Sequence, residues 1–178
     1  MRIANEFEDI ALIGGGSGMY VLLSSVLPIT LPLLITLTLS PSTPLYQILT
    51  HALSDPRNTT KFTLIYSNVT PADILLKSEF DALAAKFPRT LNVVYLVDKP
   101  TGAGASGKGE WTGPTGYITK EVIKQYVAPA DKKEKVKVFV CGPPPQVASI
   151  AGNKAGMKQG ELGGVLKELG YTEDQVCC

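Results

Sequence analysis

The segment at residues 136–145, VKVFVCGPPP, constrains the fold of this 178-residue chain more than any other. Its first part is rich in valine and typical of a strand, and it stops on Cys141, Gly142 and three prolines. Gly142 permits close approach to the backbone, and the prolines stiffen the chain and suit the start of a helix. Because parallel α/β sheets bind ligands at the carboxyl ends of their strands, the segment indicates a cofactor-binding strand end. The alternative is a proline-rich turn that only ends a core strand.

A second strand end, at residues 12–18, reads LIGGGSG. The candidate binding residues are Gly15, Gly16, Ser17 and Gly18. Small residues let phosphate groups approach backbone N–H donors, and Ser17 adds a hydroxyl group. The run is not the strict G-x-G-x-x-G motif, so by itself it is also compatible with a tight glycine turn that binds no ligand.

Apolar runs alternate with helical patterns along the chain, which predicts βαβ units and a mostly parallel sheet in one α/β domain. We expect strands at residues 10–13, 62–68, 92–98 and 136–141, with a short last strand at 175–178. We expect helices at residues 44–54, 71–87, 119–127, 144–151 and 161–169.

Charge and cysteine content exclude other classes of protein. The net charge is +1 and the lysines are scattered, so no nucleic-acid partner is expected. Three cysteines, two of them adjacent at residues 177 and 178, do not make a disulfide framework. We expect no metal site and no targeting peptide in the short, charged opening of the chain.

Several motifs together resemble one known superfamily. The two glycine-containing strand ends resemble the nicotinamide-binding domain of the ferredoxin reductase superfamily. Residues 69–76 and 95–98, VTPADILL and YLVD, resemble the NADH-cytochrome b5 reductases, and the tail at 159–171 is similar to their mitochondrial long-tailed class. The tail favours this class over the reductase end of a nitrate reductase. The resemblance covers residues 5–18 and 43–176 and implies a Rossmann-like, five-stranded parallel sheet in the order 3-2-1-4-5.

The resemblance also implies a reaction, in which NADH gives a hydride to FAD and FAD passes single electrons to cytochrome b5 or a similar haem protein. In the full-length family enzyme a preceding barrel domain holds the FAD. The motifs of that FAD-binding barrel are missing from this sequence, so we expect the chain by itself to hold no FAD. The alternative is a truncated, catalytically inactive α/β remnant that binds a nucleotide or a protein. By resemblance we expect the mitochondrial outer membrane or intermembrane space as location, with the anchor absent from this chain.

Individual site residues follow from the same resemblance. Thr43 and Pro44 continue the phosphate-binding motif, while Cys141 lies near the nicotinamide and Gly142, Pro143 and Pro144 shape the approach to it. We assign no catalytic role to any of these residues. Asp73 lies near the adenosine ribose, where a carboxylate binds the 2′-hydroxyl group and repels the 2′-phosphate of NADPH. A second interpretation, which is compatible with the first, is that Asp73 caps the start of a helix.

An uncharged apolar segment at residues 19–41 separates Gly18 from Thr43. Its length meets the threshold of about 20 residues for a membrane span, but Pro28 and Pro32 each remove a helical hydrogen bond. We interpret residues 5–178 as one NAD-binding domain that this insert interrupts. A translated retained intron is our explanation, and a genuine insertion and a membrane segment are the alternatives. We expect the insert to project away from the sheet as an exposed apolar segment.

Overall fold

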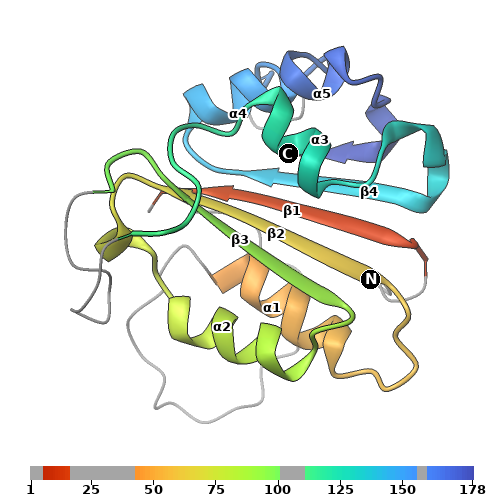
Figure 1. The fold of residues 1–178 in the computed structure, drawn as a ribbon. Coiled ribbons are helices and arrows are strands. Elements are labelled where there is room, and N and C mark those ends of the chain that lie inside the picture. The colour runs from red at the N-terminus through yellow and green to blue at the C-terminus, as the bar shows by residue number, and fades with distance from the viewer. Residues whose placement is uncertain (1–5, 17–42, 101–110, 156–159) are drawn as a thin grey trace, which may run out of the picture.

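A computed structural model describes residues 6–16, 43–100, 111–155 and 160–178 of the chain. Its centre is a parallel sheet in the order β3-β2-β1-β4-β5, as predicted (Figure 1). The strands are β1 (Asp9–Gly15), β2 (Lys61–Asn68), β3 (Leu91–Val97), β4 (Val136–Cys141) and β5 (Val176–Cys177). The four longer strands match the expected positions to within a few residues, because buried parallel strands show as near-continuous apolar runs in the sequence.

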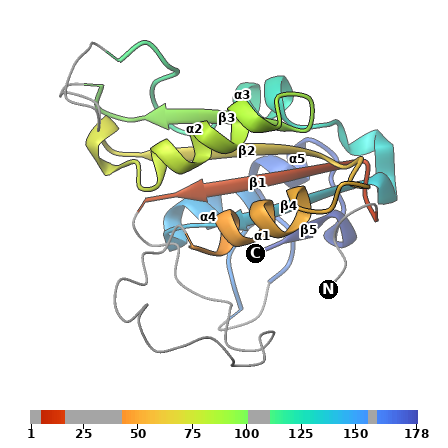
Figure 2. The ribbon, with the colours of Figure 1, turned by 90° about the horizontal axis from the view of Figure 1, so that it is seen from below.

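Helices cover both faces of the sheet and make a three-layer molecule (Figures 1 and 2). One face carries α1 (Thr43–Leu53) and α2 (Lys77–Lys86), and the other carries α3 (Lys120–Tyr126), α4 (Pro144–Ala151) and α5 (Gly164–Glu168). Short 3₁₀ segments lie at η1 (Pro71–Asp73), η2 (Ala130–Lys135) and η3 (Glu173–Gln175). No helix in these described stretches has the length and apolar character needed to cross a bilayer.

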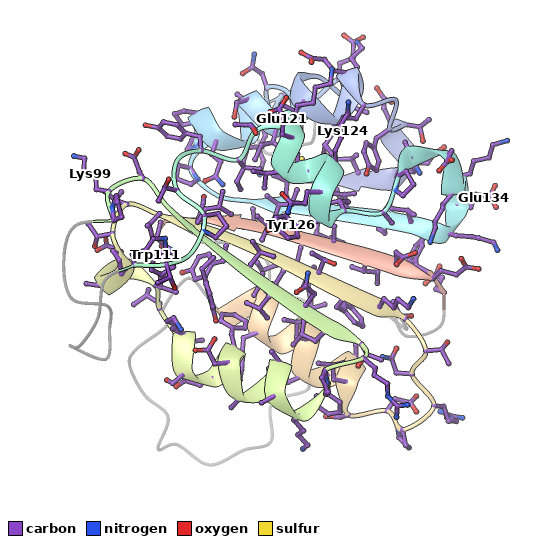
Figure 3. The ribbon with its side chains drawn as sticks, in the orientation of Figure 1. Lys99, Trp111, Glu121, Lys124, Tyr126 and Glu134 are labelled. Carbon is purple, nitrogen blue, oxygen red and sulfur yellow. The ribbon has the colours of Figure 1, made fainter. Side chains whose placement is uncertain are left out.

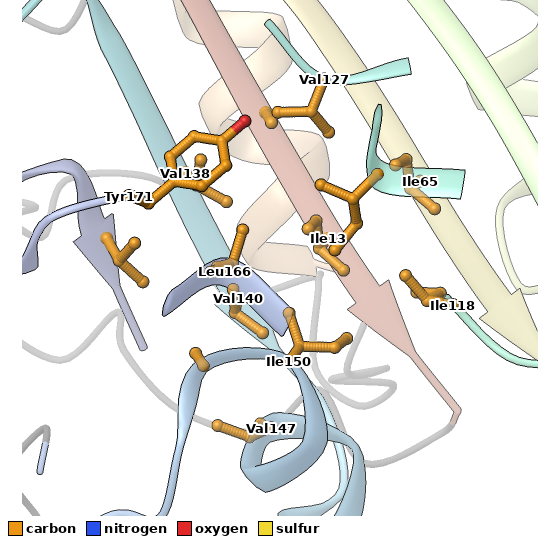
Figure 4. Close-up of a cluster of buried hydrophobic side chains, with 14 of the residues drawn as sticks. Ile13, Ile65, Ile118, Val127, Val138, Val140, Val147, Ile150, Leu166 and Tyr171 are labelled. Carbon is orange, nitrogen blue, oxygen red and sulfur yellow. The ribbon is translucent and has the colours of Figure 1, made fainter. Parts of the chain in front are cut away.

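Two hydrophobic cores lie on opposite faces of the sheet, since successive strand side chains point to opposite sides. In β1, Ile10 and Leu12 face α1 and α2, whereas Ala11 and Ile13 face α3, α4 and α5. The second of these cores gathers Ile13, Val140, Ile150 and Leu166, all of them buried (Figure 4). Burial on both faces fixes the register of the strands and therefore the positions of their carboxyl ends.

The single helix expected at residues 71–87 is wrong, because the structure breaks it in two. Residues 71–73 form η1, the backbone then extends at Ile74, and α2 starts only after Leu76, which has a left-handed φ of 53°. Ile74 is buried in the core next to α2 and anchors this turn. The apolar spacing continues across the break, so the sequence pattern did not reveal it.

Two expected elements near the C-terminus are shorter than predicted. The helix expected at 161–169 begins at Gly164, where φ is +58° and a Cβ would lie 2.3 Å from the carbonyl oxygen of Ser149. Only glycine allows α5 to pack so closely on α4. The strand expected at 175–178 contains only Val176–Cys177, because Gln175 is buried in η3, where its Nε2 donates to the carbonyl oxygens of Ala130 and Lys133.

Candidate functional site

The strand register brings the two glycine-containing strand ends together, as the strand order implied by the resemblance predicts. Gly14 of β1 pairs with Cys141 of β4, and Gly15 pairs with Ser67 of β2 on the other side. The N–H of Gly16 donates to the carbonyl oxygen of Ser67 over 2.9 Å, which holds the end of β1 against β2. β2 and β3 lie on one side of β1, and β4 and β5 lie on the other, so these strand ends lie where the winding of the sheet reverses. Parallel α/β sheets bind ligands at this position, and we call the region at the ends of β1 and β4 the crevice.

Three glycines, at positions 15, 16 and 142, leave the backbone at these strand ends without side chains. A Cβ on Gly15 would lie 1.7 Å from Oε1 of Gln146, and a Cβ on Gly142 would lie 3.0 Å from the same atom. Gly16 has a left-handed φ of 61°, which glycine adopts without strain. These three positions therefore fit a ligand that must come close to the main chain.

Gln146 was not predicted as a site residue, although its side chain lies across this crevice. It is the third residue of α4, after Pro143 at the N-cap and Pro144 at the first helical position. Its Nε2 donates to Oγ of Ser67 over 3.0 Å and so links α4 to the end of β2. The only signal in the sequence is that Gln146 is the first polar residue after the prolines; the direction of its side chain is set by the packing of α4.

Cys141 is half-buried at the end of β4. Burial raises the pKa of its thiol, and the positive charge of Lys154 opposes this only in part. The group is therefore a neutral thiol at physiological pH, which suits a residue that shapes the crevice and not a nucleophile.

Asp73 lies in η1, beyond the carboxyl end of β2, and its capping role is confirmed. One carboxylate oxygen accepts from the backbone N–H of Thr70 over 2.9 Å and from Oγ of Thr70 over 2.7 Å. The side chain is exposed, so it is also open to a ligand. Its contact with an adenosine ribose stays a prediction.

The remaining predicted site residues are placed only in part. α1 begins at Thr43 and Pro44, at the same end of the sheet as the arrowhead of β1 (Figure 2). The side chains of Thr43 and Pro44 lie outside the described part of the structure. Ser17, Gly18 and the insert at 19–41 lie outside the described residues, so their predicted roles stay predictions.

A polar hollow of about 500 Å³ lies at the opposite, amino end of the sheet, and it is lined in part by Glu8, Asp9, Lys132 and Lys135. Lys132 pairs with Asp9 and Lys135 pairs with Glu8, both over 2.6 Å. These contacts raise the pKa of Lys132 and lower that of Glu8. Figure 3 shows Glu134 at this end and Trp111 and Lys99 at the carboxyl end. Because both of these lysines already pair with carboxylates of the hollow, we place the candidate site at the glycine-containing strand ends.

A doubly wound parallel sheet with a glycine-lined crevice at its reversal point defines the dinucleotide-binding class of α/β proteins. Residues 41–151 match the family model of the oxidoreductase NAD-binding domain, and the chain belongs to that family. The expected Rossmann-like fold and the assignment of the chain as an NAD-binding domain are thereby confirmed.

Individual relatives narrow the resemblance further. The chain is 41% identical over 174 residues to NADH-cytochrome b5 reductase 2 of Aspergillus terreus, with 97% of this chain and 45% of the relative covered. It is 41% identical over 173 residues to the enzyme of the same name from Candida glabrata, with 97% of this chain and 48% of that relative covered. The chain spans about half the length of these curated relatives.

Two solved structures share the fold. The cytochrome b5 reductase domain of Ulva prolifera nitrate reductase superposes with a TM-score of 0.65 at 24% identity, over 96% of this chain and 48% of that chain. The CS-b5R domains of human Ncb5or, in an NAD⁺ form, superpose with a TM-score of 0.62 at 24% identity, over 97% of this chain and 36% of that chain. At this identity the likeness shows the fold alone.

Proposed function

We propose that the chain is the NADH-binding part of a flavoprotein that passes electrons from NADH through FAD to cytochrome b5. The observation that carries the proposal is the register of β1 and β4, which places Gly14 opposite Cys141 and joins both glycine motifs in one crevice. The relatives named NADH-cytochrome b5 reductase support the choice of reaction.

In this proposal the chain positions the dinucleotide, and the cofactors carry the redox chemistry. Gly15 and Gly16 let the pyrophosphate come close to the main chain at the end of β1. Cys141, Gly142 and Pro143 shape the end of the crevice that receives the nicotinamide. FAD, bound in the preceding domain of the full-length family enzyme, would supply the chemistry that converts a two-electron hydride transfer into single-electron transfers.

The partner and the location follow from the same resemblance. The acceptor is cytochrome b5 or a similar haem protein, and the enzyme acts at the mitochondrial outer membrane or in the intermembrane space. The support for this location is the likeness of the tail at residues 159–171 to the long-tailed mitochondrial class.

A hybrid enzyme tests the proposal. The part of the Aspergillus terreus relative that this chain does not cover, which we expect to bind FAD, would be joined ahead of this chain, in one version with residues 19–41 and in one without them. We expect the chain alone to bind NAD⁺ but no flavin, and the shorter hybrid to reduce cytochrome b5 with NADH. A yellow, NAD⁺-binding hybrid without turnover would instead support the alternative of an inactive nucleotide-binding module.

Asp73 is proposed to select NADH over NADPH, and two substitutions separate this role from capping. Asp73→Asn keeps an oxygen that can accept from Thr70 but loses the charge, whereas Asp73→Ala loses both. We expect both variants to reduce the ratio of the NAD⁺ affinity to the NADP⁺ affinity by about 5- to 150-fold, because a charged contact of about 1–3 kcal/mol is removed. Titration calorimetry measures this ratio, with Asp131→Ala as the control. If only Asp73→Ala loses stability and neither variant changes the ratio, Asp73 is a cap alone.

A further inference from the structure

The side chain of Gln146 lies in the space that the glycine floor leaves open. We infer that the side chain of Gln146 competes with the dinucleotide for the space beside Gly15 and must swing aside when NAD⁺ binds, so that this residue sets the affinity of the site. The inference rests on the proposed function, since it takes the crevice to be the NAD⁺ site.

The first observation is the position of the amide oxygen. Oε1 of Gln146 lies 1.7 Å from the place of a Cβ on Gly15 and 3.0 Å from that on Gly142. The distance at Gly15 is shorter than real Cβ atoms show, so the amide uses the volume that the absence of a side chain at Gly15 creates. A phosphate group approaching the backbone of Gly15 needs the same volume, and the two cannot share it.

The second observation is the hydrogen bonding of the amide. Nε2 donates to Oγ of Ser67 over 3.0 Å, and this bond holds the side chain across the ends of β4, β1 and β2. The carbonyl oxygen faces the two glycines and carries a partial negative charge, which disfavours an anion in this orientation. Pyrophosphate binding therefore requires that the bond to Ser67 break and the amide turn away.

Two substitutions that release the side chain should tighten binding. Gln146→Ala removes the amide, and Ser67→Ala removes its acceptor. One net hydrogen bond is worth about 0.5–1.5 kcal/mol, so we expect each variant to bind NAD⁺ about 2- to 10-fold more tightly than the unmodified chain. Gln125→Ala, an exposed glutamine of α3, is the matched control and should leave the affinity unchanged.

A third substitution tests the location of the pyrophosphate. Gln146→Glu keeps the shape of the side chain and places a negative charge in the crevice, and an acidic residue in the first turn of α4 is favourable for the helix. We expect it to fold normally and to bind NAD⁺ at least about 10-fold more weakly, since like charges would then meet.

Calorimetric titration of NAD⁺ into the full chain and its variants measures these changes, and the side-chain amide signals of Gln146 in NMR spectra report its release. Unchanged or weaker binding by folded Gln146→Ala, or amide signals that do not move on saturation with NAD⁺, would overturn the inference and leave the proposed function standing. If neither the unmodified chain nor Gln146→Ala binds NAD⁺, both the proposed function and the inference fail.

Discussion

A valine in place of Gly142 is expected to lower the affinity of the chain for NAD⁺ by about 5- to 150-fold, since forcing extra carbon atoms into a fitted space costs about 1–3 kcal/mol. The fold should tolerate the change. The nearest atoms to a Cβ at this position belong to the flexible end of Gln146, and the nearest backbone atom, the nitrogen of Gly15, is 3.4 Å away. The new methyl groups would instead fill the crevice in which we place the cofactor.

Calorimetric titration with NAD⁺ measures the loss, and thermal unfolding checks the fold. Ala85→Val, which adds the same two methyl groups at an exposed position of α2, is the control and should bind like the unmodified chain. A folded Gly142→Val variant with undiminished affinity would show that the ligand does not approach β4 at this residue.

Phe80→Ala is expected to have the largest effect on stability, a loss of about 3–5 kcal/mol in the free energy of unfolding. Phe80 is fully buried, and its ring meets those of Tyr46 and Tyr66 edge-on, with centroids 5.7 Å and 6.1 Å apart. These contacts join α2 to α1 and β2, so the substitution opens a cavity where three elements meet.

Denaturant unfolding measures this effect. Phe87→Ala removes a ring that is only half-buried, at the end of the same helix, and should cost clearly less. A loss at Phe80 no greater than at Phe87 would contradict the packing described between the sheet and this helix layer.

The sequence was sufficient to predict most of the fold because its strongest signals are local. The apolar runs of β1, β2, β3 and β4 and the prolines before α4 each report on one element. The strand order came from the resemblance, since spacing alone does not say which strands are neighbours. The break at Leu76 was missed because a left-handed residue at that point leaves the apolar pattern intact.

The sequence predicted the backbone of the site but not the side chain that crosses it. Glycines at positions 15, 16 and 142 are visible in the sequence as residues without side chains, and the register confirmed that the strand ends carrying them lie together. The bond from Gln146 to Ser67 joins residues 79 positions apart, so no local pattern reveals it. A side chain that crosses from one element to another is set by tertiary packing.

The most direct test of the account is an NMR titration of the ¹⁵N-labelled chain with NAD⁺. We predict that backbone amide signals shift at Gly15, Gly16, Ser67 and Gly142, at the carboxyl ends of β1, β2 and β4. The signals of Lys61 and Lys132, which line the polar hollow at the amino end of the sheet, should stay in place. Shifts confined to that hollow, or no shifts at saturating NAD⁺, would contradict the claim that this crevice binds the dinucleotide.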